Sequence, residues 1–314
     1  MYLSLILILA LGLASPVGAA APDAMNQKWN SLNKQVMQLY KQGKYGEAQA
    51  AAERGVKMAE TLFGPSHPNL ATSLNNLAEV YVAQGKYDQA EPLHRKALAI
   101  REKILGQSHP EVAASLNNLG ALYVSQGKYG KAEPLYQRAL AIDEKVVKEN
   151  NLDAATDLNN LGVLYRLEKR HGKAEVALKK ALAMREKALG PKDSLVAQSL
   201  NHLGELYRDQ EKYGLAEPLY QRALAIQEKA LGPHHPELAQ YLFNLGELYR
   251  LQKKHEKAVP LYKRALEVRE KSLGPDHPSL ALMLRDLAKI YRALGKKEEA
   301  QKYTDRLEKL PGRK

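Results

Sequence analysis

The sequence contains no cysteine, and among its 314 residues it has only two phenylalanines and one tryptophan. The absence of cysteine excludes disulfide bonds, thiolate metal sites and a lipid-modified N-terminal cysteine. Proline and glycine occur in ordinary numbers, so disorder is not expected to dominate the chain. Because 45% of the residues are hydrophobic, the chain has enough apolar surface to form a packed core.

Long hydrophobic runs are also missing. The apolar run from Leu3 to Leu13 has 11 residues, whereas a helix needs about 20 to cross a bilayer. The first 22 residues carry no charged side chain, and small residues follow the run. This pattern predicts a secretory signal peptide over residues 1–21, although it lacks the usual basic start, and a short uncleaved anchor is the alternative. We expect the mature chain to be soluble and exported, to a bacterial periplasm or beyond.

Charge of one sign is in excess, with a formal net charge of +12 at pH 7. A basic protein favours acidic partners, which include acidic peptides, anionic polymers and membrane surfaces. Nucleic acid is disfavoured, because the chain has no run of five or more Lys and Arg and because we expect it to be exported.

Sequence signatures of catalysis are missing as well. We find no nucleophile elbow, phosphate-binding loop, dinucleotide-binding glycine pattern or zinc-protease motif. Four histidines recur at equivalent positions, but stacked helices lie about 8–10 Å apart, and zinc needs nitrogens at about 2.0–2.1 Å. We therefore expect no enzymatic activity, metal or cofactor, and a structural role for these histidines. They are His67, His109, His235 and His277.

What the sequence does contain is one pattern repeated at a spacing of 42 residues. Its clearest copy is Leu116-Asn117-Asn118-Leu119-Gly120-Ala121-Leu122-Tyr123, followed by Gln126-Gly127-Lys128-Tyr129. A fixed period of this length is typical of a stacked array of supersecondary units. The copies begin at equivalent leucines: Leu74, Leu116, Leu158, Leu200, Leu242 and Leu284.

Each copy predicts two amphipathic helices, named A and B here. In the third copy helix A covers about 110–126 and helix B about 129–147, separated by the helix-breaking Gly127-Lys128. Pro134 is expected near the first turn of helix B, where no backbone hydrogen bond is lost. The segment Arg185-Glu186-Lys187 predicts a solvated outer face of helix B. A Leu-Gly-Pro-x-His-Pro junction ends one copy and starts the next.

The pattern resembles the tetratricopeptide repeat. Its 42-residue spacing, the Leu-Asn-Asn-Leu segment and the Gln-Gly-Lys-Tyr turn are similar to the kinesin light chain subclass. The resemblance covers about residues 25–310 and implies an all-α, right-handed α-solenoid of about seven antiparallel helix pairs. The expected pairs are 26–62, 68–105, 110–147, 152–189, 194–231, 236–273 and 278–310, with a short basic tail at 311–314.

Two columns of polar residues run through the A helices beside the core positions. In the family, the corresponding positions face a concave groove, and the resemblance assigns such asparagines to the backbone of an extended peptide. Their amides offer both donors and acceptors, so they can equally bond to the neighbouring helix and stiffen the stack. Both roles stay open. The columns contain Asn75, Asn76, Asn117, Asn118, Asn159, Asn160, Asn201, His202, Phe243 and Asn244.

A further column lies seven residues later, nearly two helical turns on, and so shares this face. It changes from valine, at Val82 and Val124, to arginine in the later copies. Guanidinium groups suit carboxylates, although Glu205 and Glu247 lie three residues before two of these arginines and can neutralise them. We therefore expect Arg166 and Arg292 to be the freer anion contacts. The column of arginines is Arg166, Arg208, Arg250 and Arg292.

These observations predict a non-enzymatic scaffold that binds an extended, acidic or amphipathic peptide in its groove. The apolar end of the segment would meet the small residues near Val82 and Val124, and Phe243 either forms a local pocket or packs on a neighbouring helix. Two alternatives stay open. The chain is a structural assembly scaffold of an envelope complex that uses its convex face, or it binds an anionic envelope polymer.

Overall fold

The computed structural model describes residues 23–145 and 151–311, and every regular element in these ranges is helical. The expected signal peptide lies outside the described residues. No described helix is long and apolar enough to cross a membrane. The A helices are α1 (Asp23–Lys41), α3 (Pro68–Ala83), α5 (Pro110–Ser125), α7 (Leu152–Leu167), α9 (Ser194–Asp209), α11 (Leu238–Leu251) and α13 (Ala281–Ala293). The B helices are α2 (Tyr45–Phe63), α4 (Tyr87–Leu105), α6 (Tyr129–Asp143), α8 (His171–Leu189), α10 (Tyr213–Leu231), α12 (His255–Leu273) and α14 (Lys297–Glu308).

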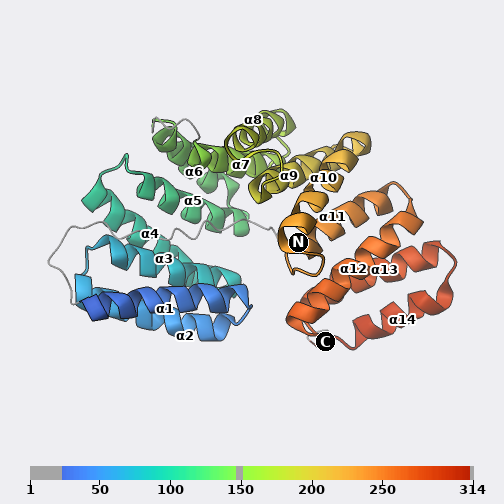
Figure 1. The fold of residues 1–314 in the computed structure, drawn as a ribbon, viewed down its shortest axis with the longest axis horizontal. Coiled ribbons are helices and arrows are strands. Elements are labelled where there is room, and N and C mark those ends of the chain that lie inside the picture. Colours follow the sequence, from blue (N-terminus) through green and yellow to red (C-terminus); the bar gives the residue numbers. More distant parts are fainter. Residues whose placement is uncertain (1–22, 146–150, 312–314) are drawn as a thin grey trace. The chain divides into compact units, whose positions relative to one another are not determined.

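The chain divides into two compact units, residues 1–168 and 169–314. Within each unit, consecutive helices pack side by side and antiparallel (Figure 1). A short 3-10 turn, Pro278–Leu280, precedes α13. The all-α repeat architecture expected from the 42-residue spacing is thus confirmed.

Tight turns join the two helices of each pair. Gly85 and Gly127 adopt positive φ angles of 74° and 70° in these turns, a conformation that costs glycine little. Glu211 and Lys253 occupy the equivalent positions of later repeats with φ near 60°, so the turn keeps its shape without glycine. The helix break predicted at Gly127 is therefore confirmed, and the surrounding repeat enforces it even where the sequence lacks the usual residue.

The interior of each helix pair is filled by size-matched partners. Gly120 on α5 and Gly204 on α9 lie directly against the rings of Tyr136 and Tyr220, leaving no room for a Cβ atom. Both tyrosine side chains are at most 1% exposed. Within the α9–α10 pair, buried valine, alanine, leucine and isoleucine side chains form a cluster of Val196, Ala197, Leu200, Ala223 and Ile226.

Two expectations about helix B were wrong. Pro134 is the sixth residue of α6, beyond the first turn, so its position costs the helix one backbone hydrogen bond. Arg185, expected on a solvated face, is 1% exposed and donates to Ser199 and Gln198 of α9 at 2.9 Å each. The last turn of helix B faces the next repeat there, so its arginine joins two repeats.

The outer surface of the B helices does carry the expected charges, as ion pairs between successive repeats. Arg138 on α6 lies 2.6 Å from Glu102 on α4, and Arg222 on α10 lies 2.6 Å from Glu186 on α8. Partly exposed pairs of this kind contribute at most about 1 kcal/mol each. They link neighbouring repeats side by side, and the series continues with Arg264–Glu228 and Arg306–Glu270.

Candidate functional site

The predicted ligand-binding residues lie on the A helices, beside the positions that form the core. In α9 the core positions are Leu200, Leu203 and Tyr207, all buried. Asn201 follows the first of these positions, and Arg208 follows the last, so both lie on the flank of the buried stripe. Each A helix presents an equivalent flank, and within each unit these flanks form a candidate site.

The asparagines join successive A helices through their side-chain amides. Nδ2 of Asn76 donates to Oδ1 of Asn33 at 2.8 Å, which connects α3 to α1. Two equivalent bonds follow, so that one bond is found at every second interface between successive A helices. They run from Asn160 to Asn117 at 3.4 Å and from Asn244 to Asn201 at 2.9 Å. The structure therefore shows these amides hydrogen-bonding within the stack, which is one of the two roles considered for them.

The other members of the columns vary in partner and exposure. Oδ1 of Asn75 lies 2.9 Å from Nδ1 of the buried His94. Asn118 is half-buried on α5. Asn159 and His202 are 2% and 8% exposed, on α7 and α9. Peptide contact by the asparagine columns stays a prediction.

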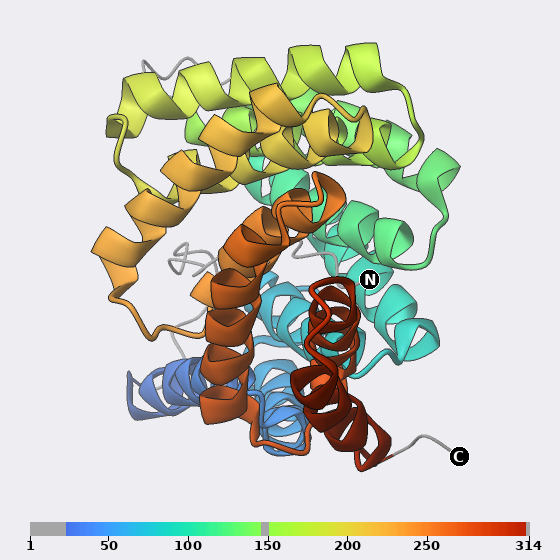
Figure 2. The same cartoon turned by 90° about the vertical axis from the view of Figure 1, so that its right-hand side faces the viewer.

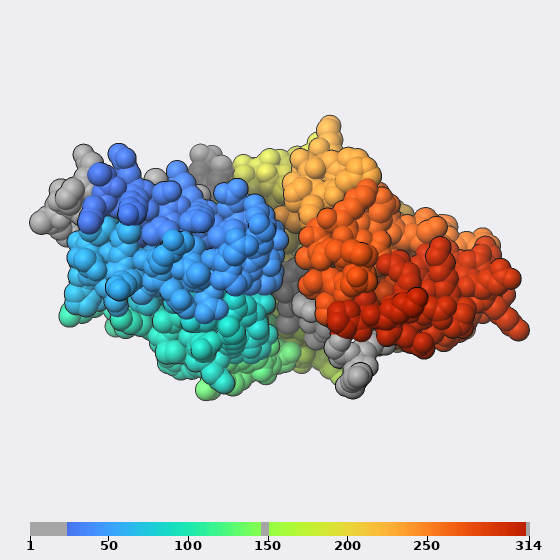
Figure 3. Space-filling view, turned by 90° about the horizontal axis from the view of Figure 1, so that it is seen from below, coloured from blue at the N-terminus to red at the C-terminus, as the bar shows by residue number. Residues whose placement is uncertain are grey.

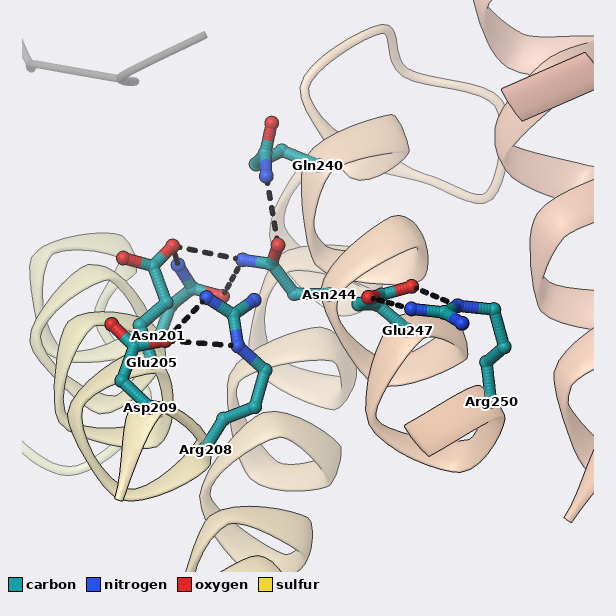
Figure 4. A network of polar contacts seen from close by, with 8 residues as sticks. All are labelled: Asn201, Glu205, Arg208, Asp209, Gln240, Asn244, Glu247 and Arg250. Atoms are coloured by element: carbon teal, nitrogen blue, oxygen red, sulfur yellow. Dashed lines mark hydrogen bonds and ion pairs between the residues drawn. The ribbon is translucent and has the colours of Figure 1, made fainter. Parts of the chain in front are cut away.

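In the second unit the network extends to charged residues of α9 and α11 (Figure 4). Asn244 donates to the Glu205 carboxylate at 3.0 Å, and Asn201 donates to the same carboxylate at 3.1 Å. Gln240 donates to Oδ1 of Asn244 at 2.9 Å. Glu205 thus accepts from amides of two neighbouring repeats and fixes their orientation.

Two of the predicted arginines are ion-paired on this face. Arg250 donates through Nε and Nη2 to the two Glu247 oxygens at 2.7 and 2.5 Å. This pairing confirms the ion pair predicted from the three-residue spacing of Glu247 and Arg250. Arg208, however, bonds to Asp209 at 2.8 Å, and Glu205 acts on it only at longer range. The hydrogen bonds to Glu247 raise the pKa of Arg250, so this side chain stays charged. Arg208 and Arg250 remain 20% and 31% exposed.

The two arginines expected to be freer lie in different units. Arg292, on α13 in the second unit, is exposed, and its Nη2 donates to Oγ1 of Thr304 at 2.8 Å. Arg166 is half-buried near the end of α7 in the first unit. Their role as anion contacts stays a prediction.

Phe243 packs on a neighbouring helix. Its ring meets that of Tyr262 on α12 edge to face, with centroids 5.3 Å apart, and its side chain is half-buried. The Tyr262 hydroxyl donates to Glu247 at 2.5 Å. Phe243 therefore lies over the same tyrosine that supports the Glu247–Arg250 pair. Of the two roles considered for Phe243, a local pocket or packing on a neighbouring helix, the structure shows the packing.

The flank of the first unit is less apolar than the sequence indicated. Val124 is buried and Val82 half-buried, as expected for a small apolar face. Glu79, however, is 3% exposed on α3, and its burial raises the pKa of the carboxyl to about 8. Its Oε1 lies 3.6 Å from Nε2 of His94, whose pKa burial lowers to about 3. Both groups are therefore neutral near pH 7. Glu205 and Glu247 occupy the positions equivalent to Glu79 in later repeats. This recurrence of glutamate was the sequence signal for an acidic residue on the flank of the first unit, and the prediction of an apolar face did not take it into account.

A second unanticipated feature is a buried pair of carboxyls in the first unit. Asp143 on α6 and Asp157 on α7 are 4% and 0% exposed. Asn117 donates to Asp157 at 2.5 Å. Burial, followed by the neighbouring Asp143 charge, raises the pKa of Asp157 to about 8. One proton shared by the pair removes the repulsion that two buried carboxylates would suffer.

The junction histidines each accept a hydrogen bond from the backbone two residues further along the chain. Nδ1 of His67 accepts from the Asn69 backbone N–H at 3.1 Å, and Nδ1 of His109 accepts from that of Glu111 at 3.2 Å. His235 and His277 make the same contact in the second unit. Within the described ranges, no cluster of three or more His, Cys, Asp or Glu side chains is placed to bind a metal. The expected junction role is thus seen directly in the hydrogen bonds.

The family model of the tetratricopeptide repeat matches this chain five times, and the matches cover most of its length. They span residues 30–103, 74–145, 111–187, 195–271 and 249–307. The chain belongs to the tetratricopeptide repeat family. Tetratricopeptide repeat (TPR) proteins are protein–protein interaction scaffolds, which is the class predicted from the sequence.

Solved TPR structures resemble the chain in fold. BtubC (BKLC) from P. vanneervenii is 22% identical with a TM-score of 0.60, over 72% of this chain and 88% of that one. A putative kinesin light chain from Podosopora anserina, with nearly identical TPR-like repeats, is 23% identical with a TM-score of 0.55, over 68% and 99%. PilW, a widely conserved type IV pilus biogenesis factor, is 22% identical with a TM-score of 0.55, over 76% and 92%. No curated protein matches the sequence. The kinesin light chain-like repeat is thus confirmed for the fold.

Proposed function

We propose that this TPR protein binds an extended segment of a partner protein in the concave groove of the repeat, along the flanks of its A helices, and that the segment carries acidic side chains. The observation that carries the proposal is a contrast within α9 and α11. Their core positions repeat, as in Leu200 and Leu242. On the flank, Asn201 is replaced by the half-buried Phe243, whereas Arg208 and Arg250 occupy equivalent positions and remain partly exposed. Partly exposed guanidinium groups that recur along one flank are suited to a ligand that carries carboxylates.

The paired arginines retain the capacity to bind carboxylates. A guanidinium has five N–H donors, and the carboxylate of Asp209 or Glu247 engages only Nε and Nη2. In both side chains Nη1 makes no hydrogen bond within the described residues. A carboxylate of the bound segment can therefore join the existing pair at Arg208 or Arg250. The amide network fixes the helix flanks around them, which lowers the entropy cost of binding.

A peptide array tests this function directly. Purified wild-type protein is expected to capture acidic peptides at least several-fold more strongly than matched basic ones. The Arg208→Gln/Arg250→Gln variant should bind them about thirtyfold more weakly, since each of the two lost contacts is worth on the order of 1 kcal/mol. Arg222→Gln/Arg264→Gln is the matched control, because those arginines are ion-paired to a similar extent on the B helices.

The control also separates the alternatives. Loss of partner binding in the B-helix variant alone would favour assembly through the opposite surface. Equal capture of acidic and basic peptides would refute the acidic specificity. Steep salt dependence without any peptide preference would indicate binding to an anionic polymer.

We also propose that the protein acts outside the cytoplasm, in the bacterial envelope or beyond it. The uncharged N-terminal segment and the absence of cysteine in the sequence support this. The fold resemblance to PilW, a type IV pilus biogenesis factor, is compatible with it. N-terminal sequencing of protein from fractionated cells tests the proposal. A mature N-terminus near residue 22 is expected, whereas intact protein confined to the cytoplasm would contradict export.

A further inference from the structure

The last A helix carries three cationic side chains on one exposed face. On α13, Arg285, Lys289 and Arg292 follow one another at spacings of four and three residues, which places them in a row along one side of the helix. All three are exposed, and the residues between them pack against α12 and α14. We call this row the α13 stripe. Figures 2 and 3 show α12 to α14, orange to red, as one continuous packed layer.

The stripe differs in charge from the equivalent rows of the preceding repeats. The corresponding residues of α11 are Phe243, Glu247 and Arg250, in which the carboxylate neutralises the guanidinium. In α13 a lysine, Lys289, stands where α11 has Glu247. The acid that balances the row in α11 is therefore replaced by a third cation.

Few described groups compensate this charge. Lys289 makes no hydrogen bond or ion pair within the described residues, and Arg292 bonds only to the neutral hydroxyl of Thr304. The nearest acid is Asp286, which lies 3.8 Å from Nε of Arg285 and is 6% exposed. The stripe is thus a local surplus of positive charge beside a charge-balanced flank.

We propose that the α13 stripe binds the acidic part of the partner segment, with carboxylates at alternate positions of an extended chain. This inference rests on the proposed peptide-binding function and locates its acidic end. Four residues of helix rise about 6 Å, and alternate residues of an extended chain lie about 6.6 Å apart. Carboxylates two residues apart can therefore reach Arg285 and Lys289 together. Arg292, about 4.5 Å further along the axis, takes the next acidic group or a terminal carboxylate.

The limited length of the stripe favours a short peptide over an extended anionic surface. From Arg285 to Arg292 the helix rises only about 10 Å. On α11 the equivalent Arg250 is already paired with Glu247, so the positive field does not continue along the unit. A lipid surface or polymer would engage cations over a wider area.

The test uses the full chain and an eight-residue labelled peptide of alternating serine and glutamate, with a serine–glutamine peptide as reference. Wild type should bind the glutamate peptide at least tenfold more tightly than the glutamine peptide. The stripe variant, Arg285→Gln/Lys289→Gln/Arg292→Gln, should lose at least tenfold in affinity for the glutamate peptide. The control variant removes three exposed lysines, one on α12, one on α14 and one directly after α14, and should lose less than twofold. It carries Lys263→Gln, Lys302→Gln and Lys309→Gln.

Each outcome decides a different point. Equal weakening in both variants would mean that net charge, and not the stripe, attracts the peptide, and would overturn the proposal. Binding of phosphatidylglycerol vesicles that depends on the stripe, without peptide binding, would also overturn it. If the array captures acidic peptides and the stripe variant binds them unchanged, only the stripe assignment fails. If the array captures nothing, the peptide-binding function itself fails. Far-ultraviolet circular dichroism of both variants should match wild type, because all six residues are exposed.

Discussion

At the scale of single residues, the helix pairs depend on matched side-chain sizes. A Cβ atom on Gly120 would lie 2.6 Å from the Tyr136 ring, and one on Gly204 would lie 2.8 Å from that of Tyr220. In the second repeat Ala78 replaces the glycine, and the smaller His94 replaces the tyrosine. The pair therefore varies together, which keeps the two helices at a similar separation.

This matching predicts opposite effects of the same substitution at two glycines. Gly120→Ala should lower the free energy of unfolding by about 1–3 kcal/mol, because it overpacks the interface with Tyr136. Gly55→Ala, also inside a helix but with no atom within 4 Å of the added Cβ, should raise it by about 0.5–1 kcal/mol. Urea unfolding of both variants checks the prediction. Equal destabilisation by both substitutions would show that the close contact with Tyr136 does not determine the effect of Gly120→Ala.

The Asp143–Asp157 pair predicts a particular dependence of stability on pH. The pKa of Asp157 rises from 3.8 to about 8 on folding, so between these values the folded state holds a proton that the unfolded state releases. Its stabilising contribution is complete below pH 3.8 and is lost as the pH rises to 8, by at most about 1.4 kcal/mol per pH unit. The difference in unfolding free energy between wild type and Asp157→Asn should therefore change steadily over this range. A constant difference would contradict a raised pKa.

At the scale of helices, side-chain capping of the first turn differs between the A helices and the B helices. Helices α3 and α5 begin at a histidine whose Nδ1 accepts a backbone hydrogen bond, whereas α9 uses the carboxylate of Asp193 for the same purpose. None of the described B helices has a side-chain cap. Side-chain caps thus occur on the A helices α3, α5, α7 and α9, whereas α11 and α13 begin without one.

The histidine caps predict a loss of stability when the acceptor is removed. Nδ1 of His109 accepts from the Glu111 backbone N–H at 3.2 Å at the start of α5, and a side-chain cap of this kind is worth about 1 kcal/mol. His109→Ala should therefore lower the free energy of unfolding by about 1 kcal/mol, whereas His109→Asp, which keeps an acceptor at this position, should lower it less. Urea unfolding of the two variants provides the measurement, and equal destabilisation by both would refute a capping role.

At the scale of the whole molecule, stability is distributed over contacts between neighbours. Within each of the two units, the described helices pack mainly on the helices before and after them in the chain. In such arrays stability is approximately a sum over repeats and their interfaces. The fragment 194–314, which contains three helix pairs of the second unit, should therefore fold alone. Circular dichroism should show a helical spectrum and a cooperative transition, at a lower urea midpoint than that of the full chain. A fragment without helical signal would show that folding requires the first unit.

The architecture followed from the sequence alone, because leucine, glycine and tyrosine recur every 42 residues at the positions that form the buried faces of a helix pair. The sequence also located the candidate face and the Glu247–Arg250 pair, since both follow from residue spacing within one helix. Contacts between helices do not follow from spacing. Tertiary packing alone decided that Arg185 is buried, that Arg208 bonds to Asp209 and that the asparagines bond to one another. It also decided that Glu79 and Asp157 lose their water and keep a proton, because desolvation depends on what the neighbouring repeats place around a carboxyl.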